Sequence, residues 1–315
     1  MKKALLAFLL CFCTSVLGQP YPAKPVRLVV PFPAGGVTDI LARLLAQKLG
    51  EAWGQTLFVE NRSGAGGNIG VVQVARGAPD GYQLLVTTSS IAVNMTLSAN
   101  PGYDLLKDLV PVINVASSPN MIITAQSGPA TLRELIEKSK ASGLIYGSAG
   151  AGTTPHLTAE YLFKNLTGLK VTHVPYKGAA PAVNAAIMGE VVAVSVAMPT
   201  AVPHIRSGRL RGLAVMSNTR IGALPEVPTV QELGFPGFED YTWVGVFVPS
   251  GTPPGVVAKI NTDINAFLAQ PDSRERLASF GFDPVGGSPE SFATYIKGEV
   301  SKWAKVIRET GAKIE

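Results

Sequence analysis

Short apolar runs alternate with helical patterns along the whole chain. The runs are three to six residues long and rich in Val, Ile and Leu, as buried strands are. We predict strands over Val26–Val30, Leu57–Val59, Leu84–Thr87, Val112–Val115, Met121–Thr124, Ile145–Gly147, Val171–Val174, Val191–Val196, Leu213–Val215 and Val244–Val248. Predicted helices between them include Asp39–Leu49, Leu132–Ser139, Thr154–Phe163, Ala180–Met188 and Val256–Ala269. This alternation predicts an α/β fold with mainly parallel sheets.

The 315-residue length favours two domains, although no repeat or low-complexity linker divides the chain. One boundary is expected near Val115–Pro119, where two apolar runs meet with only "ASSP" between them, and another in the extended stretch Trp243–Pro249. If both are crossovers, the two ends of the chain form one domain, residues 23–117 plus 247–315, and residues 118–246 form the other. Two crossover strands would make a hinge.

The first eighteen residues have the pattern of a secretory signal peptide. Lys2 and Lys3 precede an apolar stretch that reaches Val16, and Gly18 is a suitable cleavage point. A membrane anchor is the alternative, but the stretch is shorter than the roughly 20 apolar residues that a spanning helix needs. We therefore expect residues 1–18 to be removed on export.

Both cysteines, Cys11 and Cys13, lie in this segment, and the bulky residues Leu10 and Phe12 before them argue against lipid attachment. The mature chain would have no cysteine, which excludes disulfides, a cysteine nucleophile and thiolate metal sites.

Charge gives no sign of a nucleic-acid partner. The formal charge of +5 includes Lys2 and Lys3, so the mature balance is 25 basic minus 22 acidic residues, or +3. The densest basic cluster, Arg206 to Arg211, is interrupted by Gly208 and has no interleaved aromatic residues. A solvated turn explains it better than nucleic-acid binding does.

Three glycine-rich loops, Pro31–Thr38, Glu60–Gly70 and Tyr146–His156, each follow a strand and precede a helical pattern. In open α/β sheets the ligand crevice lies outside the carboxyl ends of the strands, where these loops belong. Unpaired amides at a helix N-terminus attract anions, and glycine permits close backbone approach. Each loop alone could be a tight corner that binds nothing. Three of them in one chain favour a shared anion cleft.

Enzyme motifs fail when they are checked residue by residue. The pattern GxGxxG breaks at Pro155 or at Ile69, a GKS or GKT sequence is absent, and Ser148 in "YGSAG" is one residue short of a GxSxG elbow. The three histidines, His156, His173 and His204, stand far apart without carboxylates at metal spacing, so we assign them to capping and packing. Lys177, in a fourth strand-to-helix loop, either meets an anion or is simply exposed.

Seven blocks, in order, resemble one known family. They are "VPFPAGGVTDILAR", "VENRSGAGGNIG", "PDGYQLLV", "YGSAGAGTTPHL", "HVPYKGAAPAVNAAIMGEV", "HIRSGRLRGLAV" and "LPEVPTVQELGFPGFE". Together they are similar to the substrate-binding proteins of tripartite tricarboxylate transporters, the TctC or Bug family, over essentially the whole mature chain.

The resemblance implies a periplasmic protein with a type II periplasmic-binding-protein fold: two α/β domains, joined by two crossover strands, that close on a small carboxylate. It also implies that backbone amides and waters, rather than an arginine, hold the carboxylate. Carried over to this chain, the ligand-binding residues are Phe32, Ala34, Gly35, Gly36, Thr38, Gly66, Gly67, Asn68, Thr88, Ser89, Ser148, Ala149, Gly150, Gly152, Thr153, His156, Ala197 and Met198.

One departure from the family pattern bears on the ligand. Members often carry an acid shortly after the position of Glu190 and another a few residues later, where this chain has Val192 and Val196. An acid in the cleft could receive an ammonium group, so an amino-acid ligand is less favoured here. Phe32, Val196 and Met198 would form apolar walls for an aromatic or aliphatic acid.

The leading hypothesis is a monomeric, non-enzymatic binding protein, without cofactor or metal, that delivers an organic acid to a membrane permease. A sensor that docks on a membrane receptor in its bound state is an alternative. The rival from another class is a secreted hydrolase with Ser148 as nucleophile and His156 as base, although the sequence places no acid to orient that histidine.

Overall fold

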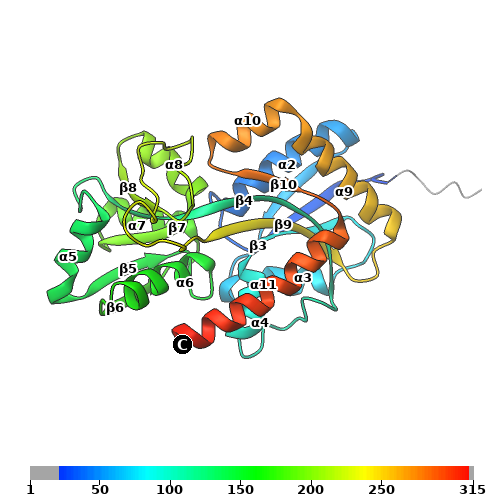
Figure 1. Ribbon diagram of the computed structural model, residues 1–315. Coiled ribbons are helices and arrows are strands. Elements are labelled where there is room, and N and C mark those ends of the chain that lie inside the picture. Colours follow the sequence, from blue (N-terminus) through cyan, green and yellow to red (C-terminus); the bar gives the residue numbers. More distant parts are fainter. Residues whose placement is uncertain (1–20, 312–315) are drawn as a thin grey trace, which may run out of the picture.

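The computed structural model describes residues 21–311, which form two α/β lobes lying side by side (Figure 1). The predicted signal peptide, residues 1–18, lies outside the described residues. No helix within 21–311 combines the length and the apolar character needed to cross a membrane.

The first lobe is built on the sheet order β2-β1-β3-β9-β4, with β10 pairing β4 at its edge. β1 pairs in parallel with β2 and β3, whereas β9 runs antiparallel to β3. The strands are β1 (Val26–Val30), β2 (Leu57–Asn61), β3 (Gln83–Thr88), β4 (Leu109–Ala125), β9 (Tyr241–Pro249) and β10 (Asp283–Gly286).

Helices cover both faces of this sheet, each over its own buried apolar cluster. One face carries α2 (Val37–Trp53), α9 (Pro254–Ala269) and α10 (Pro271–Ser279). The other carries α3 (Asn68–Ala75), preceded by the 3₁₀ turn η2 (Ala65–Gly67), with α4 (Ser90–Leu97) and α11 (Pro289–Thr310). Near-continuous apolar strands such as Val26–Val30 fit this double covering.

The second lobe continues from β4 through β7, β5 and β6, and β8 also pairs β4. Its strands are β5 (Leu144–Ser148), β6 (Val171–Pro175), β7 (Ala193–Ala197) and β8 (Leu210–Val215). α7 (Ala179–Met188) and α8 (Met198–Arg206) pack on one face. α5 (Leu132–Ser142) and α6 (Thr154–Glu160) pack on the other, and the π-helical segment η3 (Tyr161–Leu166) prolongs α6.

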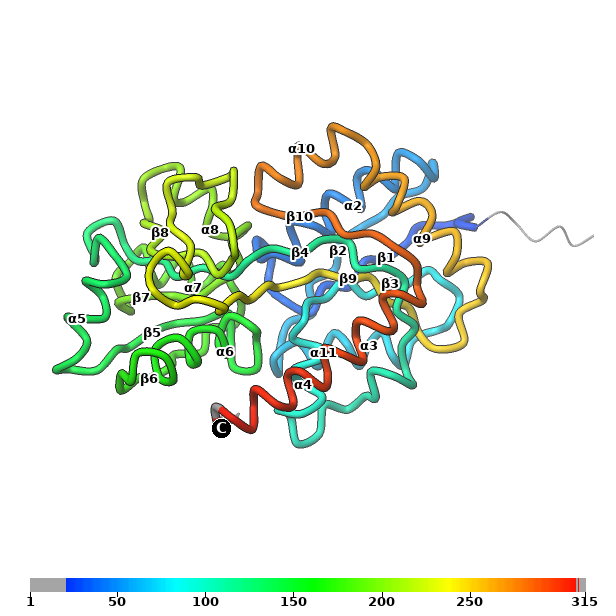
Figure 2. The backbone as a smooth tube through the Cα atoms, in the orientation of Figure 1, coloured from blue at the N-terminus to red at the C-terminus, as the bar shows by residue number. Residues whose placement is uncertain are grey.

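Two long strands, β4 and β9, connect the lobes, as Figure 2 shows. They pair antiparallel from Leu109 opposite Pro249 to Pro119 opposite Tyr241, and β4 continues into the second sheet. The fold therefore confirms two α/β units joined by two crossover strands. The predicted interruption of β4 at "ASSP" is wrong, because Ala116, Ser117, Ser118 and Pro119 all keep their pairing with β9.

Other differences are local. The predicted strand Val191–Val196 is β7, shifted to Ala193–Ala197, because Gly189 ends α7 in the left-handed region (φ 73°) and the chain is still turning at Val191 and Val192. β10 was not predicted, since it is four residues long and contains a proline and a glycine.

Candidate functional site

Five helices begin around one small cavity between the lobes. These are α2 and α4 of the first lobe and α6, α7 and α8 of the second. The cavity has a volume of about 30 Å³, and no charged side chain contributes to its wall as the described residues form it. We call it the inner cavity; it is lined by Phe32, Gly36, Val37, Thr38, Thr88, Ser90, Ala149, Thr153, Pro155, Ala179, Ala197 and Thr242.

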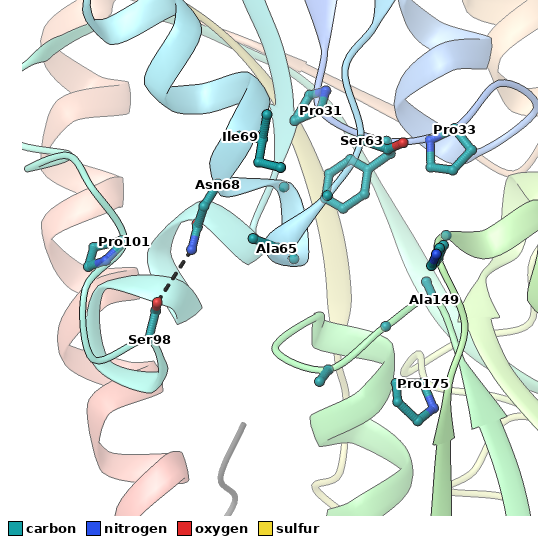
Figure 3. A pocket seen from close by; sticks show the side chains of 18 of the residues that line it. Pro31, Pro33, Ser63, Ala65, Asn68, Ile69, Ser98, Pro101, Ala149 and Pro175 are labelled. Carbon is teal, nitrogen blue, oxygen red and sulfur yellow. Dashed lines mark hydrogen bonds between the residues drawn. The ribbon is translucent and has the colours of Figure 1, made fainter. Parts of the chain in front are cut away.

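A larger cavity of about 790 Å³, the outer chamber, lies next to it (Figure 3). Phe32 and Ala149 line both spaces. The outer chamber is bounded on one side by the first lobe, with Pro31–Pro33, residues 63–69, Val72, Ser98, Asn100 and Pro101, and on the other by the second lobe, with residues 149–151 and 175–178. Lys177 supplies the charged side chain in this lining.

The loops of the two lobes touch beside these cavities. A Cβ atom on Gly178 would lie 2.7 Å from Cδ of Pro33, and one on Gly66 would lie 3.3 Å from the carbonyl oxygen of Ala151. Both glycines also have positive φ, 127° for Gly178 and 63° for Gly66. Glycine is favoured at both positions, because the Pro33 ring or the Ala151 carbonyl crowds a side chain there and because the backbone is left-handed or nearly so.

The buried side chain of Asp39 holds the first loop, Pro31–Thr38, through hydrogen bonds. Its carboxylate accepts the Gly35 N–H at 2.9 Å, two hydrogen bonds from the Arg43 guanidinium at 2.9 and 3.0 Å, and the Asn61 amide at 3.0 Å. Burial alone would raise the pKa of Asp39, but Arg43 and the other donors lower it overall. The Gly35 amide is therefore occupied within the loop.

The residues that follow Gly35 begin α2 at the wall of the inner cavity. The first backbone bond into α2 runs from the Ile40 N–H to the Gly36 carbonyl at 3.0 Å. Within residues 21–311 the N–H groups of Gly36, Val37 and Thr38 have no acceptor, as is usual at a helix start, and all three residues line the cavity.

The second loop is closed by bonds among its own residues. Ser148 Oγ accepts the Gly150 N–H at 3.2 Å, Thr153 Oγ1 donates to the Gly150 carbonyl at 2.7 Å, and the Gly152 N–H points at His156 Nδ1 at 3.4 Å. The amides of Gly150 and Gly152 are thereby used to shape the loop. Ala149, Thr153 and Pro155 are the residues of this loop that line the inner cavity.

Two histidines that were expected to lie apart are stacked. The rings of His156 and His173 are 4.0 Å apart between centroids, and Tyr146 lies on the other side of His173 at 5.1 Å. The prediction of separate histidines is wrong because α6, which carries His156, packs against β6, which carries His173. The pairing of β5 with β6 also sets Tyr146 opposite His173. Burial lowers the pKa of His156 to about 4 and that of His173 to about 3, so both rings are neutral near pH 7.

This arrangement does not support a hydrolase. Ser148 Oγ lies 2.7 Å from Nε2 of His173, not from His156, and Ser148 is fully buried and lines neither cavity. Residues 21–311 also contain no group of three or more His, Cys, Asp or Glu residues placed to hold a metal ion.

Hydroxyl groups complete the inner wall. Thr88 Oγ1 donates to Ser90 Oγ at 3.0 Å, which leaves the Ser90 proton without an acceptor among the described residues. The Thr38 hydroxyl likewise has no protein acceptor within residues 21–311, and both side chains line the cavity. Sequence reasoning missed Ser90, although it follows directly on the predicted Thr88 and Ser89, and missed Thr242 on the crossover strand.

The structure brings together eleven of the eighteen predicted ligand residues at the two cavities: Phe32, Gly36, Thr38, Gly66, Gly67, Asn68, Thr88, Ala149, Gly150, Thr153 and Ala197. The other seven line neither cavity: Ala34, Gly35, Ser89, Ser148, Gly152, His156 and Met198. Met198 packs against Gly281, and Val196, expected as an apolar wall, is buried in the core of the second lobe.

Comparisons with known proteins agree with this architecture. Residues 41–312 match the family model TctC, described as "Tripartite tricarboxylate transporter family receptor". The chain is 40% identical to protein BugT of Bordetella pertussis over 306 residues, 95% of this chain and 93% of the relative.

Two solved structures are similar over their whole length. The periplasmic binding protein BugD is 36% identical, with a TM-score of 0.88 over 94% of this chain and 100% of that one. R. palustris Rpa4515 with adipate is 38% identical, with a TM-score of 0.90 over 93% of this chain and 100% of that one.

Proposed function

Because the chain belongs to TctC, the family of tripartite tricarboxylate transporter receptors, we propose that it is a periplasmic solute-binding protein. It captures a small organic acid between its lobes and delivers it to the permease of such a transporter. The predicted signal peptide, residues 1–18, would direct its export. It acts as a monomer and performs no reaction on its ligand.

The observation that carries this proposal is the convergence of five helix starts on an uncharged cavity. Each helix N-terminus carries a partial positive charge of about half a unit and several unpaired N–H groups. The amides of Gly36, Val37 and Thr38 and the hydroxyls of Thr38 and Ser90 offer donors to an anion. Such a site holds a carboxylate without an arginine.

The two cavities suggest how the ligand is arranged. The inner cavity, at about 30 Å³, has room for one or two water-sized groups, such as the oxygens of a carboxylate, and not for a whole diacid. The remainder of the ligand would pass between Phe32 and Ala149 into the outer chamber. Lys177 there would attract a second carboxylate at the far end of the molecule. Adipate, which Rpa4515 holds, is an acid of this kind.

Calorimetric titration with adipate, hexanoate, benzoate and glutamate tests the proposal. A dissociation constant near micromolar, about 8 kcal/mol, is expected for the best ligand. Adipate and hexanoate form a matched pair, since they differ only in the second carboxylate. Lys177→Gln should weaken the binding of adipate by about 3- to 10-fold and leave the affinity for hexanoate unchanged. If no small carboxylate binds the wild-type protein, the proposed function is wrong.

Transport is favoured over sensing, because the family model describes a transporter receptor. Deletion of the gene should abolish uptake of the ligand identified by titration. Normal uptake combined with loss of the transcriptional response to that ligand would support the sensor instead.

A further inference from the structure

A buried chain of side-chain hydrogen bonds runs from one lobe to the other behind the inner cavity. It starts at Asp240, just before β9, whose carboxylate accepts the Asn120 side-chain amide at 2.7 Å and the Thr158 hydroxyl. Asn120 Oδ1 accepts the Thr242 hydroxyl at 2.8 Å. Thr242 lies 2.7 Å from Thr154, and Thr154 lies 3.1 Å from Ser89, between hydroxyl oxygens.

All members of this chain are buried, and its last bond spans the two lobes directly. Ser89, Thr154 and Asn120 are fully buried, and Thr242 and Asp240 are exposed by 2% and 5%. Ser89 precedes α4 of the first lobe, whereas Thr154 begins α6 of the second. The Ser89–Thr154 bond therefore links the two lobes directly, next to the crossover strand β9.

The direction of every proton in the chain follows from the carboxylate. An ionised carboxylate only accepts, so Asn120 must turn its NH₂ group to Asp240 and its oxygen to Thr242. Since a hydroxyl has one proton, Thr242 gives its proton to Asn120, Thr154 gives its own to Thr242, and Ser89 donates to Thr154.

We propose that Asp240 is a positioning residue for ligand capture, which orients the Asn120–Thr242–Thr154 chain so that Ser89 donates the hydrogen bond that latches the lobes together. In the same orientation the Thr242 proton is used in the hydrogen bond to Asn120, so Thr242 could only accept a hydrogen bond from a ligand. Asp240 does this without lining either cavity.

The surroundings of Asp240 are consistent with this role. Burial raises the pKa of Asp240 to about 6, while Lys302, Thr158 and Asn120 act to lower it, so the group is ionised at pH 7.5. The other ionisable groups that act on it, Glu299 and Tyr295, also come from α11. None of these groups takes part in the chain that leads to Ser89.

Hydrogen–deuterium exchange of the full chain at pH 7.5, without added ligand, tests the latch. Segments 88–94 and 153–158 face each other at the Ser89–Thr154 bond, and β1 and β5 serve as internal references. Ser89→Ala should speed exchange in both segments by about 5-fold, equivalent to about 1 kcal/mol at 1.4 kcal/mol per tenfold. Ser139→Ala is the matched control, because it removes a buried hydroxyl whose bond to the Leu135 carbonyl stays within α5.

A double-mutant cycle tests the part played by Asp240. Asp240→Asn alone should speed exchange in both segments. In a Ser89→Ala protein it should cause no further increase in the exchange rate, whereas in a Ser139→Ala protein it should cause the same increase as in the wild type. If Asp240→Asn does not fold, Thr242→Val breaks the chain at the next hydroxyl and takes its place in the cycle.

Two results would overturn the proposal. Faster exchange in segment 88–94 alone would mean that Ser89 only stabilises its own lobe. Additive effects of the Asp240 and Ser89 substitutions would mean that Asp240 does not act through the chain. Because no ligand is added, neither result depends on the proposed function.

Discussion

Gly36 offers the sharpest test of the inner cavity. Its backbone (φ −82°, ψ 171°) is extended, a conformation open to every residue, and the heavy atom nearest to its ideal Cβ position, the Pro33 carbonyl oxygen, is 3.6 Å away. A Cβ at this position is therefore accommodated by the fold. The further carbons of a valine would compete with a ligand for the inner cavity, which Gly36 lines and which has a volume of only about 30 Å³.

The expected loss of affinity follows from the hydrogen bonds that the valine displaces. A hydrogen bond to a charged group contributes about 1.5–3 kcal/mol. Exclusion of a carboxylate from two such donors would cost about 3–6 kcal/mol, which weakens binding by about two to four orders of magnitude. The free energy of unfolding should change by no more than about 1 kcal/mol, because a lost glycine N-cap and a stiffer unfolded chain act in opposite directions.

Calorimetric titration of Gly36→Val with the best wild-type ligand, together with urea denaturation, measures both quantities. Gly222→Val is the matched control, since Gly222 is exposed, has no positive φ and has no heavy atom within 4 Å of its ideal Cβ. Wild-type affinity in Gly36→Val at unchanged stability would refute the assignment of the carboxylate to the inner cavity.

Three further predictions concern the support of the site. Asp39→Ala should lower the free energy of unfolding by about 2 kcal/mol, because the Gly35 amide and Asn61 lose a charged acceptor; a urea midpoint equal to that of wild type would contradict this. Glu299→Ala should lower the free energy of unfolding by about 2–5 kcal/mol, because it removes the carboxylate that accepts the indole N–H groups of Trp243 at 2.9 Å and Trp303 at 3.1 Å. Glu309→Ala, an exposed substitution on the same helix, should leave the free energy of unfolding almost unchanged. The free energy of unfolding should fall between pH 6.5 and pH 4, since the unfolded chain protonates its histidines near 6.5 while folding lowers the pKa of His156 to about 4 and of His173 to about 3. Asp240, whose pKa burial raises to about 6, offsets part of this fall, because it holds its proton more readily in the folded chain. Urea midpoints across this range should show a shallower slope for His173→Gln, and an unaltered slope would exclude His173 as a cause.

Much of the fold could be predicted because the strands are buried on both faces and read as apolar runs. Only pairing partners could show that β4 runs unbroken through "ASSP", since Ser117 and Ser118 are held extended by Trp243 and Thr242 of β9. β10 lacks an apolar signal of its own and exists because it can pair with β4.

The positions of the loops around the site could be predicted, but the use of each amide could not. Gly36 reaches the inner cavity as a helix start should, whereas the Gly35 amide is taken by Asp39, four residues later. The spacing of Gly35, Asp39 and Arg43 was a usable signal for that outcome. The stacking of His156 on His173 had no such signal, because it depends on how α6 packs against β6.

The two buried carboxylates near the inner cavity stand behind its wall rather than in it. A carboxylate in the wall would repel an anionic ligand at short range, where little water screens the interaction. Behind the wall, the same groups act as fixed acceptors. Asp39 accepts the Gly35 N–H and so fixes the bend that leads to the amides of Gly36 and Val37, while Asp240 accepts the side-chain amide of Asn120. The charge of Asp39 is offset by Arg43, which faces away from the cavity toward solvent with 57% of its side chain exposed. The cavity thus retains the positive potential of its helix starts, and the acids that shape it subtract little from its attraction for a carboxylate.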